Sequence, residues 1–329
     1  MMKKALFLWP IVAVLLFSCK EKSAQKKATG QINTISVIID DQLWNGVVGD
    51  SIRNKFASPV IGLPKEEPLF TINQYPIRLL EGFTTNSRNI IVVKKEAENR
   101  FQLIENEFAT PQNVFHISGK TAAAVLNLIE SYAPEIIEKM RATEIAANQK
   151  IIDTSLVNTQ KITQKFNVSL HIPKGFNLVM RKRRFMWYKK EVTSGNSSLL
   201  IYQLPISAIR NTQDLTSNII RVRDSIGNLY IRGTVPGSKM LTEGSYAPYL
   251  SNVRIKNKPA YETRGTWELQ NDFMSGPFLN YAIVDRPNRR VLILEGFVYA
   301  PSREKRDLMF ELESIIKSVE FHQKRTKRK

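Results

Sequence analysis

Cysteine and histidine are scarce in this chain of 329 residues, which contains one cysteine and three histidines. A single cysteine cannot form a disulfide within the chain, and the lack of a local histidine pair argues against a zinc site. The HExxH, CxxC, P-loop, Gly-x-Gly-x-x-Gly and Gly-x-Ser-x-Gly motifs are also missing. The sequence therefore gives no indication of the metalloprotease, dithiol, nucleotide-binding or serine-hydrolase chemistry that these motifs support. We expect no metal ion and no cofactor.

The composition is otherwise close to that of a globular protein, with 43% hydrophobic and 24% charged residues. These values argue against wholesale disorder, collagen and a multi-span membrane protein. The length fits two domains of ordinary size. Lysine and arginine number 48 against 30 aspartate and glutamate residues, a formal net charge of +18. This excess favours anionic neighbours, and composition does not choose among phospholipid head groups, cell-wall phosphates and nucleic acids.

Residues 1–18 have the pattern of a secretion signal. Lys3 and Lys4 precede an apolar run from Ala5 to Phe17, which is shorter than the ~20 residues that a membrane-spanning helix requires. The run leads into Leu16-Phe17-Ser18-Cys19, which resembles the bacterial lipobox. That resemblance implies cleavage before Cys19 and acylation of its thiol and its new amino group; the alternative is a buried free thiol. Two or three acyl chains exceed the two signals that stable anchoring requires.

Residues 19–30 are expected to be the lipidated cysteine and a flexible tether, because Lys20 to Gly30 contains no large apolar residue. Removal of residues 1–18 takes away two lysines and no acids, so the net charge falls from +18 to +16. Lys20 follows the cysteine where, by analogy with enterobacterial sorting, an aspartate would suggest retention in the inner membrane. The expected location is therefore the cell envelope, at the outer membrane and facing the periplasm.

Residues 31–159 are expected to form an N-terminal α+β domain. The pattern of β-branched and apolar residues predicts strands at 34–39, 69–75, 89–94 and 113–118, and a helix at 43–56. A long helical stretch covers 120–152. Pro134 lacks an amide hydrogen, so it must either kink this helix or begin a new one.

Residues 160–322 are expected to form a second α+β domain, an antiparallel sheet packed with two helices, followed by a basic tail at 323–329. Strands are predicted at 166–172, 185–192, 198–204, 262–269, 278–284 and 290–299, and a helix at 214–230. The last two strands flank residues 285–289 and should pair as a hairpin. Ser302 can cap a final helix, whose apolar stripe comprises Leu308, Met309, Leu312, Ile315, Ile316 and Val319. This order of elements resembles the small Mog1/PsbP-like sandwich.

Five segments together resemble an uncharacterised lipoprotein family of Bacteroidota that is known only as a domain of unknown function. They are DDQLWNGVVGDSIRNKF, GLPKEEPLF, RNIIVV, TRGTWELQNDFMSGPF and EGFVYAPSREKRDLMFELESI. The resemblance covers nearly all of the mature chain and implies a lipoprotein. It supplies no catalytic or binding residue, because none is established in that family.

Asp40 and Asp41 are the best catalytic candidates in the sequence. They follow the predicted strand 34–39, and carboxylates at the carboxyl end of a strand often project into a crevice where Mg²⁺ or phosphate can bind. Asp50, Glu66 and Glu67 lie within reach in sequence. The alternative interpretation is that two aspartates leaving a strand form an ordinary turn or helix cap.

A second polar cluster surrounds Trp267 and comprises Arg264, Glu268 and Asp272. Because residues 264, 266 and 268 share one face of a strand, Arg264 and Glu268 could flank a cleft. The alternative is a cross-strand ion pair on a solvated face, which would stabilise the protein by less than ~1 kcal/mol.

The decamer from Arg181 to Lys190 combines six cations with three aromatic residues. Its cations Arg181, Lys182, Arg183, Arg184, Lys189 and Lys190 could contact an anionic polymer or anionic lipid, with the rings at the level of the head groups. The alternative is a solvated turn followed by the inward-facing rings of a strand. Acylation and export would take the protein away from nucleic acid, which we therefore do not expect as a partner.

These observations favour a non-enzymatic envelope lipoprotein that acts as a binding or assembly module. Its expected partners are membrane lipid, through acylated Cys19, and an envelope protein or anionic polymer. The alternative is an envelope enzyme, a metal-dependent hydrolase of a phosphate-bearing or cell-wall substrate that uses Asp40 and Asp41.

Overall fold

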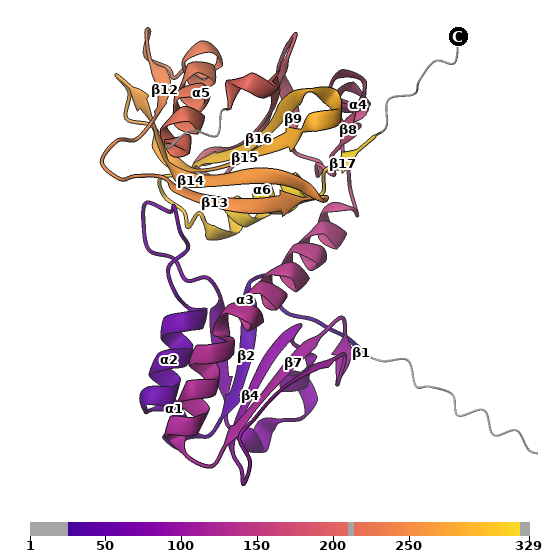
Figure 1. The fold of residues 1–329 in the computed structure, drawn as a ribbon, viewed down its shortest axis with the longest axis vertical. Helices are drawn as coiled ribbons and strands as arrows, with labels where there is room; N and C mark the ends of the chain where they lie inside the picture. The colour runs from indigo at the N-terminus through magenta and orange to yellow at the C-terminus, as the bar shows by residue number, and fades with distance from the viewer. Residues whose placement is uncertain (1–25, 210–213, 323–329) are drawn as a thin grey trace, which may run out of the picture.

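The computed structural model describes residues 26–209 and 214–322, which form two domains joined through one long helix (Figure 1). Both domains combine helices with a sheet, and the sheet of the second domain is antiparallel, so the predicted α+β class is confirmed. Within these two ranges, no helix combines the length and the apolar character that crossing a membrane requires. Cys19 and the basic tail 323–329 lie outside the described residues.

The N-terminal domain is built on a five-stranded sheet with the order β3-β2-β4-β7-β5. The first four strands are parallel, and β5 is antiparallel to β7. The strands span Thr34–Ile39 (β2), Thr71–Tyr75 (β3), Asn89–Lys95 (β4), Arg100–Glu105 (β5) and Asn113–Gly119 (β7). Four of them match the predicted strands, and β5 was not predicted. It lies at the edge of the sheet, and its sequence is largely polar and partly exposed.

Three helices cover one face of this sheet: α1 (Asp41–Trp44), α2 (Val47–Phe56) and α3 (Ala122–Ile152). The helix predicted at 43–56 is divided at Asn45 and Gly46. By contrast, α3 continues through Pro134, so the prediction of a restart at this residue is wrong. In Figure 1, α3 runs first beside α2 and then obliquely up to the second domain.

The chain joins the folded domain earlier than the tether prediction allowed. Lys26–Lys27 (β1) pairs with Ala109–Thr110 (β6), and the amides of Ala28 and Thr29 donate to backbone carbonyls 2.9 and 2.8 Å away. Ala28 is buried. The predicted tether through Gly30 is therefore too long, because these backbone bonds order a segment that has no apolar pattern of its own.

The C-terminal domain is built on an eight-stranded antiparallel sheet with the order β12-β14-β15-β16-β11-β10-β9, in which β13 also pairs with β14. The strands are β9 (Asn177–Lys182), β10 (Phe185–Val192), β11 (Gly195–Pro205), β12 (Lys239–Thr242), β13 (Tyr249–Ile255), β14 (Lys258–Gln270), β15 (Ser275–Asp285) and β16 (Arg290–Tyr299). The predicted hairpin of the last two strands is confirmed. Its turn contains the 3-10 helix η4 (Arg286–Asn288).

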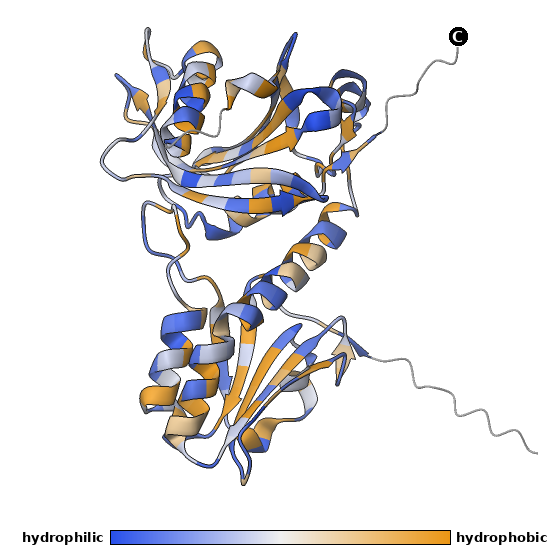
Figure 2. Cartoon of the chain, viewed as in Figure 1, coloured by the Kyte–Doolittle hydropathy of each residue, from blue (hydrophilic) through white to orange (hydrophobic). Residues whose placement is uncertain are grey.

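Helices cover both faces of this sheet. Residues on α5 (Leu215–Tyr230) pack on one face and residues on α6 (Arg306–Lys317) on the other. Strand β10 divides its side chains between these cores, since Phe185 lies on the α5 side and Met186 and Tyr188 lie on the α6 side. Figure 2 shows hydrophobic (orange) and hydrophilic (blue) stretches along the strands of this sheet. The predicted strand interpretation thus accounts for the aromatic residues of the decamer.

The strand predicted at 166–172 is largely wrong. Helix α4 (Gln160–Phe166) occupies its beginning, and only Val168–Ser169 (β8) pairs, with Glu320–Phe321 (β17). The alternating residues are nevertheless all buried in the core on the α6 side: Phe166, Val168, Leu170 and Ile172. One-sided burial of a mostly extended segment produces the same period of two as a sheet strand.

Helix α6 joins the two domains through its polar side. The predicted apolar stripe is confirmed, because its residues pack into the core of the C-terminal domain. The predicted Ser302 cap is wrong, since the helix begins at Arg306. The buried carboxylate of Glu67 instead accepts hydrogen bonds from the backbone amides of Lys305 and Arg306, at 2.7 to 2.9 Å. The N-terminal domain thus caps a helix of the C-terminal domain.

Candidate functional site

Asp40 and Asp41 lie at the carboxyl end of β2, as predicted, but both are exposed. Asp40 occupies the N-cap position of α1, and its backbone carbonyl accepts from the amides of Leu43 and Trp44 at 3.0 and 2.9 Å. A carboxylate oxygen of Asp41 lies 3.5 Å from Gln74 Nε2. The described residues contain no group of three or more histidine, cysteine or acidic side chains that could hold a metal ion.

Asp50 and Glu67, which are close to this pair in sequence, interact with other groups. Asp50 pairs with Arg53 at 2.7 Å, and Glu67 caps α6. The structure therefore brings no third acid to Asp40 and Asp41, and their arrangement is that of a strand end turning into a helix.

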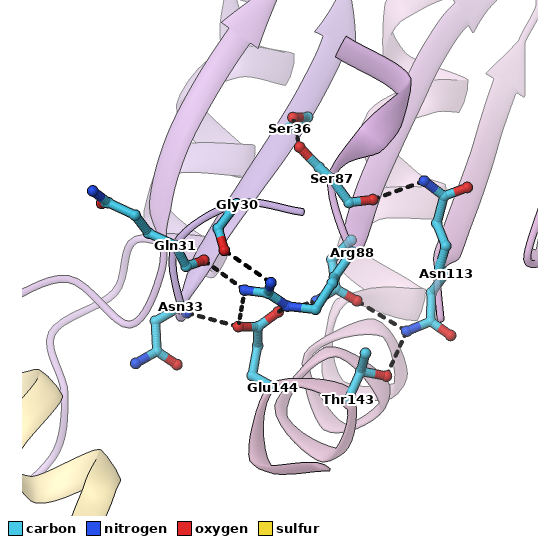
Figure 3. A network of polar contacts seen from close by, with 11 residues as sticks. Gly30, Gln31, Asn33, Ser36, Ser87, Arg88, Asn113, Thr143 and Glu144 are labelled. Carbon is cyan, nitrogen blue, oxygen red and sulfur yellow. Dashed lines mark hydrogen bonds and ion pairs between the residues drawn. The ribbon is translucent and has the colours of Figure 1, made fainter. Parts of the chain in front are cut away.

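A buried polar network lies at the opposite end of the same sheet (Figure 3). Glu144 of α3 is fully buried and pairs with Arg88 at 2.9 Å. It also accepts from the Asn33 amide at 2.8 Å and from Asn89 Nδ2 at 2.9 Å. Asn33 precedes β2, and Asn89 opens β4, so this carboxylate holds the amino ends of parallel strands. Ligands of such sheets bind at the carboxyl ends, which gives the network a structural role.

The cluster predicted around Trp267 is reorganised by the domain interface. Arg264 does not pair with Glu268, which is exposed; it pairs with Glu262 at 2.5 Å and with Glu313 of α6 at 3.0 Å. Trp267 is buried and donates to the Val298 carbonyl at 3.2 Å. Asp272 accepts from the amide of Phe273 in a turn. The side chain of Arg264 is thus directed to Glu313 of α6, at the domain interface, and not to Glu268.

Glu313 is the centre of this interface. Its buried carboxylate also pairs with Arg141 of α3 at 2.5 Å and with Lys317 at 2.8 Å. Burial alone would raise the pKa of Glu313, but the charges of Arg264, Arg141 and Lys317 hold it well below the ordinary value. Three cations therefore meet one carboxylate where the domains touch.

The basic decamer forms the β9–β10 hairpin, and its six cations fall into two groups. Arg181, Lys182, Arg183 and Arg184 are exposed at the turn, and none of them forms an ion pair with another described residue. Lys189 and Lys190 are engaged further along β10. Lys189 pairs with Glu191 at 2.8 Å, and Lys190 pairs with Glu311 at 2.5 Å. Only the four cations of the turn are available to a partner.

Next to this turn lies a pocket with a volume of about 540 Å³, which we call the basic pocket. Its wall combines α4, the β9–β10 turn, the end of β11 and the β15–β16 turn. The lining residues are Gln164, Lys165, Phe166, Asn167, Arg184, Gln203, Leu204, Pro205, Asn288, Arg289 and Arg290. Four of them are cationic and none is acidic, so the pocket is suited to an anion.

Lys165 is fixed beside the hairpin. Its Nζ donates to the backbone carbonyls of Lys182 and Arg183 at 2.8 and 3.2 Å. Burial and the charge of Arg181 lower the pKa of Lys165, which indicates that the ammonium lies in a cation-rich region without a neutralising carboxylate.

Arg290 is held from behind the pocket wall. Its Nε donates to buried Asp285 at 2.8 Å and its Nη1 to Gln203 Oε1 at 2.8 Å, whereas its buried Nη2 has no hydrogen-bond partner. Burial alone would raise the pKa of Asp285, but hydrogen bonds from Asn288, Lys258 and Arg290 hold it below the ordinary value. Asp285 therefore stays ionised while it orients Arg290.

The sequence indicated Arg184 as a contact for anions but not Lys165, Arg289 or Arg290. Arg289 and Arg290 belong to the predicted hairpin and its turn, and Lys165 lies directly before the predicted strand 166–172. The remaining signal was the composition of Asp285 to Arg290, in which three arginines accompany one acid. Turn residues carry function more often than strand residues do, but nothing in the sequence placed this turn beside residues 165 and 184.

Two family models match the chain. Residues 155–318 match a domain of unknown function, DUF4837, and residues 28–153 match a second one, DUF8532. A search of curated proteins finds no match.

Solved structures give weak similarities of fold. The Ran-binding protein Mog1p of Saccharomyces cerevisiae has 9% identity, a TM-score of 0.32, and coverage of 47% of this chain and 89% of its own. Cyanobacterial PsbP from Synechocystis has 10% identity, a TM-score of 0.32, and coverage of 47% and 87%. Human StAR-related lipid transfer protein 5 has 9% identity, a TM-score of 0.25, and coverage of 53% and 93%.

The resemblance to the Mog1/PsbP sandwich thus extends to a weak similarity of structure. The chain consists of two successive regions, and each region matches a family described as a domain of unknown function.

Proposed function

We propose that this protein is a lipid-anchored envelope protein of Bacteroidota, a non-enzymatic module that binds an anionic partner in its basic pocket. The observation that carries this proposal is the lining of that pocket, which has four cations and no acid. The unpaired cations of the adjacent β9–β10 turn extend the same positive surface. An anionic lipid, polymer or envelope protein carries the negative charge that complements this positive surface.

The same lining supports binding rather than catalysis. Its residues include no carboxylate, histidine, serine or cysteine, and the Nζ of its lysine already donates to two backbone carbonyls, so the lining favours holding an anion over supplying a general base or a nucleophile. The alternative of a metal-dependent hydrolase depends on Asp40 and Asp41. The described residues bring no third acid, histidine or cysteine to that pair.

The envelope location is proposed from the sequence around Cys19. The secretion signal, the lipobox-like Leu16 to Cys19 and the lack of any other cysteine together support acylation of this residue. Lys20 after the cysteine supports the outer membrane, with the protein facing the periplasm.

Metabolic labelling tests the anchor. The full chain expressed in a Bacteroidota host with an alkyne analogue of palmitate should become labelled and sediment with the outer membrane. Cys19→Ala should lose the label and leave the membrane fraction. Equal labelling of both proteins, or an unprocessed Met1 terminus on native material, would contradict the anchor.

Vesicle binding tests the partner class. The chain with residues 1–19 removed keeps both domains and should sediment with anionic vesicles at low salt, and less so at high salt. Arg184→Gln with Arg289→Gln should weaken this binding by roughly tenfold or more. Lys120→Gln with Arg78→Gln removes the same charge from exposed sites of the other domain and should have little effect.

Metal titration tests the alternative function. We expect no calorimetric heat from binding of Mg²⁺ or Mn²⁺ to the same protein. A heat that disappears in Asp40→Asn would favour the hydrolase and count against the proposed module.

A further inference from the structure

The structure points to a narrower ligand class within the proposed function, on which this inference rests. We propose that the basic pocket binds a phosphate group that carries a covalently attached organic group, with Lys165 Nζ donating to the phosphate oxygens and the Arg290 guanidinium turning toward them. Arg184 and Arg289 line the same pocket and supply further positive charge.

Lys165 has a donor to spare. An ammonium group carries three hydrogens, and two of them are directed to the carbonyls of Lys182 and Arg183. No other acceptor contacts Nζ among the described residues. The two carbonyls fix the position of the ammonium without neutralising its charge, so the third hydrogen is placed for an external acceptor.

Arg290 supplies the second unsatisfied donor. Asp285 and Gln203 engage its Nε and Nη1, but Nη2 is buried without a partner. A buried donor without an acceptor is destabilising, and native proteins rarely keep one without a reason. Because Nη2 is closed to solvent, the guanidinium has to turn toward the pocket that Arg290 lines before a ligand oxygen can become its acceptor.

The number of positive charges favours phosphate over carboxylate. Asp285 pairs with Arg290 from behind the pocket wall, so three lining cations have no acid partner, whereas one carboxylate would bring only a single negative charge and two oxygens. A phosphate monoester brings up to two negative charges and three free oxygens, and both arginine and lysine are common phosphate ligands. Burial and Arg181 already lower the pKa of Lys165, and a bound dianion would relieve that repulsion.

The size of the pocket favours a substituted phosphate over the bare ion. Its volume of about 540 Å³ lies within the range of ~300–1,000 Å³ that is typical of sites for whole small molecules. Phe166, Leu204 and Pro205 add apolar surface to the wall, which an attached organic group can contact. Glycerol phosphate has this chemistry as a monoester, either free or as the head group of phosphatidic acid.

Calorimetry with small probes tests the inference. The chain with residues 1–19 removed is titrated with glycerol phosphate, inorganic phosphate and acetate at constant ionic strength. Glycerol phosphate should bind tightest and acetate should not bind detectably. Lys165→Gln and Arg290→Lys should each weaken glycerol phosphate binding by about tenfold or more, and Lys120→Gln should not. Thermal melting checks that every variant is folded. If Arg290→Lys does not fold, the result for Lys165→Gln decides the test.

Vesicles that contain phosphatidic acid, whose phosphate is a monoester, identify the source of the phosphate. Binding that Lys165→Gln weakens by a similar factor supports a lipid head group. Vesicle binding that ignores Lys165→Gln, together with glycerol phosphate binding that depends on it, supports a soluble phosphate ester.

Acetate that binds as tightly as the phosphates, or glycerol phosphate binding that ignores Lys165→Gln, would overturn the inference. Vesicle binding that still weakens in Arg184→Gln with Arg289→Gln would then leave the broader proposed function standing.

Discussion

Two regions of this protein gather cations in opposite ways. At the domain interface, Arg141, Arg264 and Lys317 converge on the carboxylate of Glu313. In the basic pocket, Lys165, Arg184 and Arg289 have no carboxylate partner among the described residues, and Arg290 leaves one nitrogen without an acceptor. The comparison teaches that a cation count does not identify a binding site. The presence or absence of an acid beside the cations separates a structural cluster from one that can accept a ligand.

The largest expected effect comes from removing the acid of the interface. Glu313→Gln should lower the free energy of unfolding by about 1–3 kcal/mol, because it removes the buried carboxylate that three partly buried cations share. Urea denaturation measures this loss. Glu311→Gln is a matched control on the same helix, where the partly exposed pair with Lys190 should contribute less than ~1 kcal/mol. Equal losses in both variants would contradict the special role of the interface.

Acid should remove the same stabilisation. Because the pKa of Glu313 is lower in the folded protein than the ordinary value of ~4.3, its contribution is complete above that value. It is lost as the pH falls further, through the folded pKa. The difference in unfolding free energy between the wild type and Glu313→Gln should therefore shrink below about pH 4.3. A difference that stays constant in denaturation series from pH 6 to pH 3 would be evidence against this.

The cap that crosses the domain boundary should have an intermediate effect. Glu67→Ala removes the acceptor for the amides of Lys305 and Arg306 and should cost about 1 kcal/mol, the usual contribution of a helix cap. Ser302→Ala should change the unfolding free energy by less than ~0.5 kcal/mol, as expected for an exposed turn residue. A larger loss in Ser302→Ala than in Glu67→Ala would indicate that Ser302 caps the helix.

The smallest effect on stability should come from the basic pocket. Arg184 and Arg289 are exposed and have no acid partner, so Arg184→Gln with Arg289→Gln should alter the unfolding free energy by no more than ~0.5 kcal/mol. Thermal and urea denaturation measure this. A large loss of unfolding free energy would show that these arginines stabilise the fold, as the cations of the interface do, and would contradict the contrast between the two regions.

Local patterns predicted much of the fold. The apolar stripe of α6 correctly identified the buried face of this helix. A helix has 3.6 residues per turn, so residues spaced three and four apart lie on one side and contact the same sheet. The strand at Thr34–Ile39 and the β15–β16 hairpin followed from β-branched runs and a turn sequence. The errors arose where a distant residue decides the local structure. Glu67, which lies in the other domain, caps α6 and makes Ser302 unnecessary.

The candidate site was predicted only in part. The charge of Arg181 to Arg184 is visible in the sequence, and the structure leaves those four cations unpaired. Lys190 looked equivalent but pairs with Glu311, which follows it by more than a hundred positions. Lys165 and Arg290 reach the same pocket from separate elements. The pairing of β11 with β16 places Arg290, and hydrogen bonds to the carbonyls of Lys182 and Arg183 place Lys165.

The early start of β1 limits where the protein can work. If Cys19 carries the acyl chains, residues 20–25 alone connect lipid to the strand that begins at Lys26. Six residues at full extension reach only about 20 Å, so the connection between the lipid and the domain would be short. The N-terminal domain would then stay beside the bilayer, and ligands would have to come to the membrane surface to meet it.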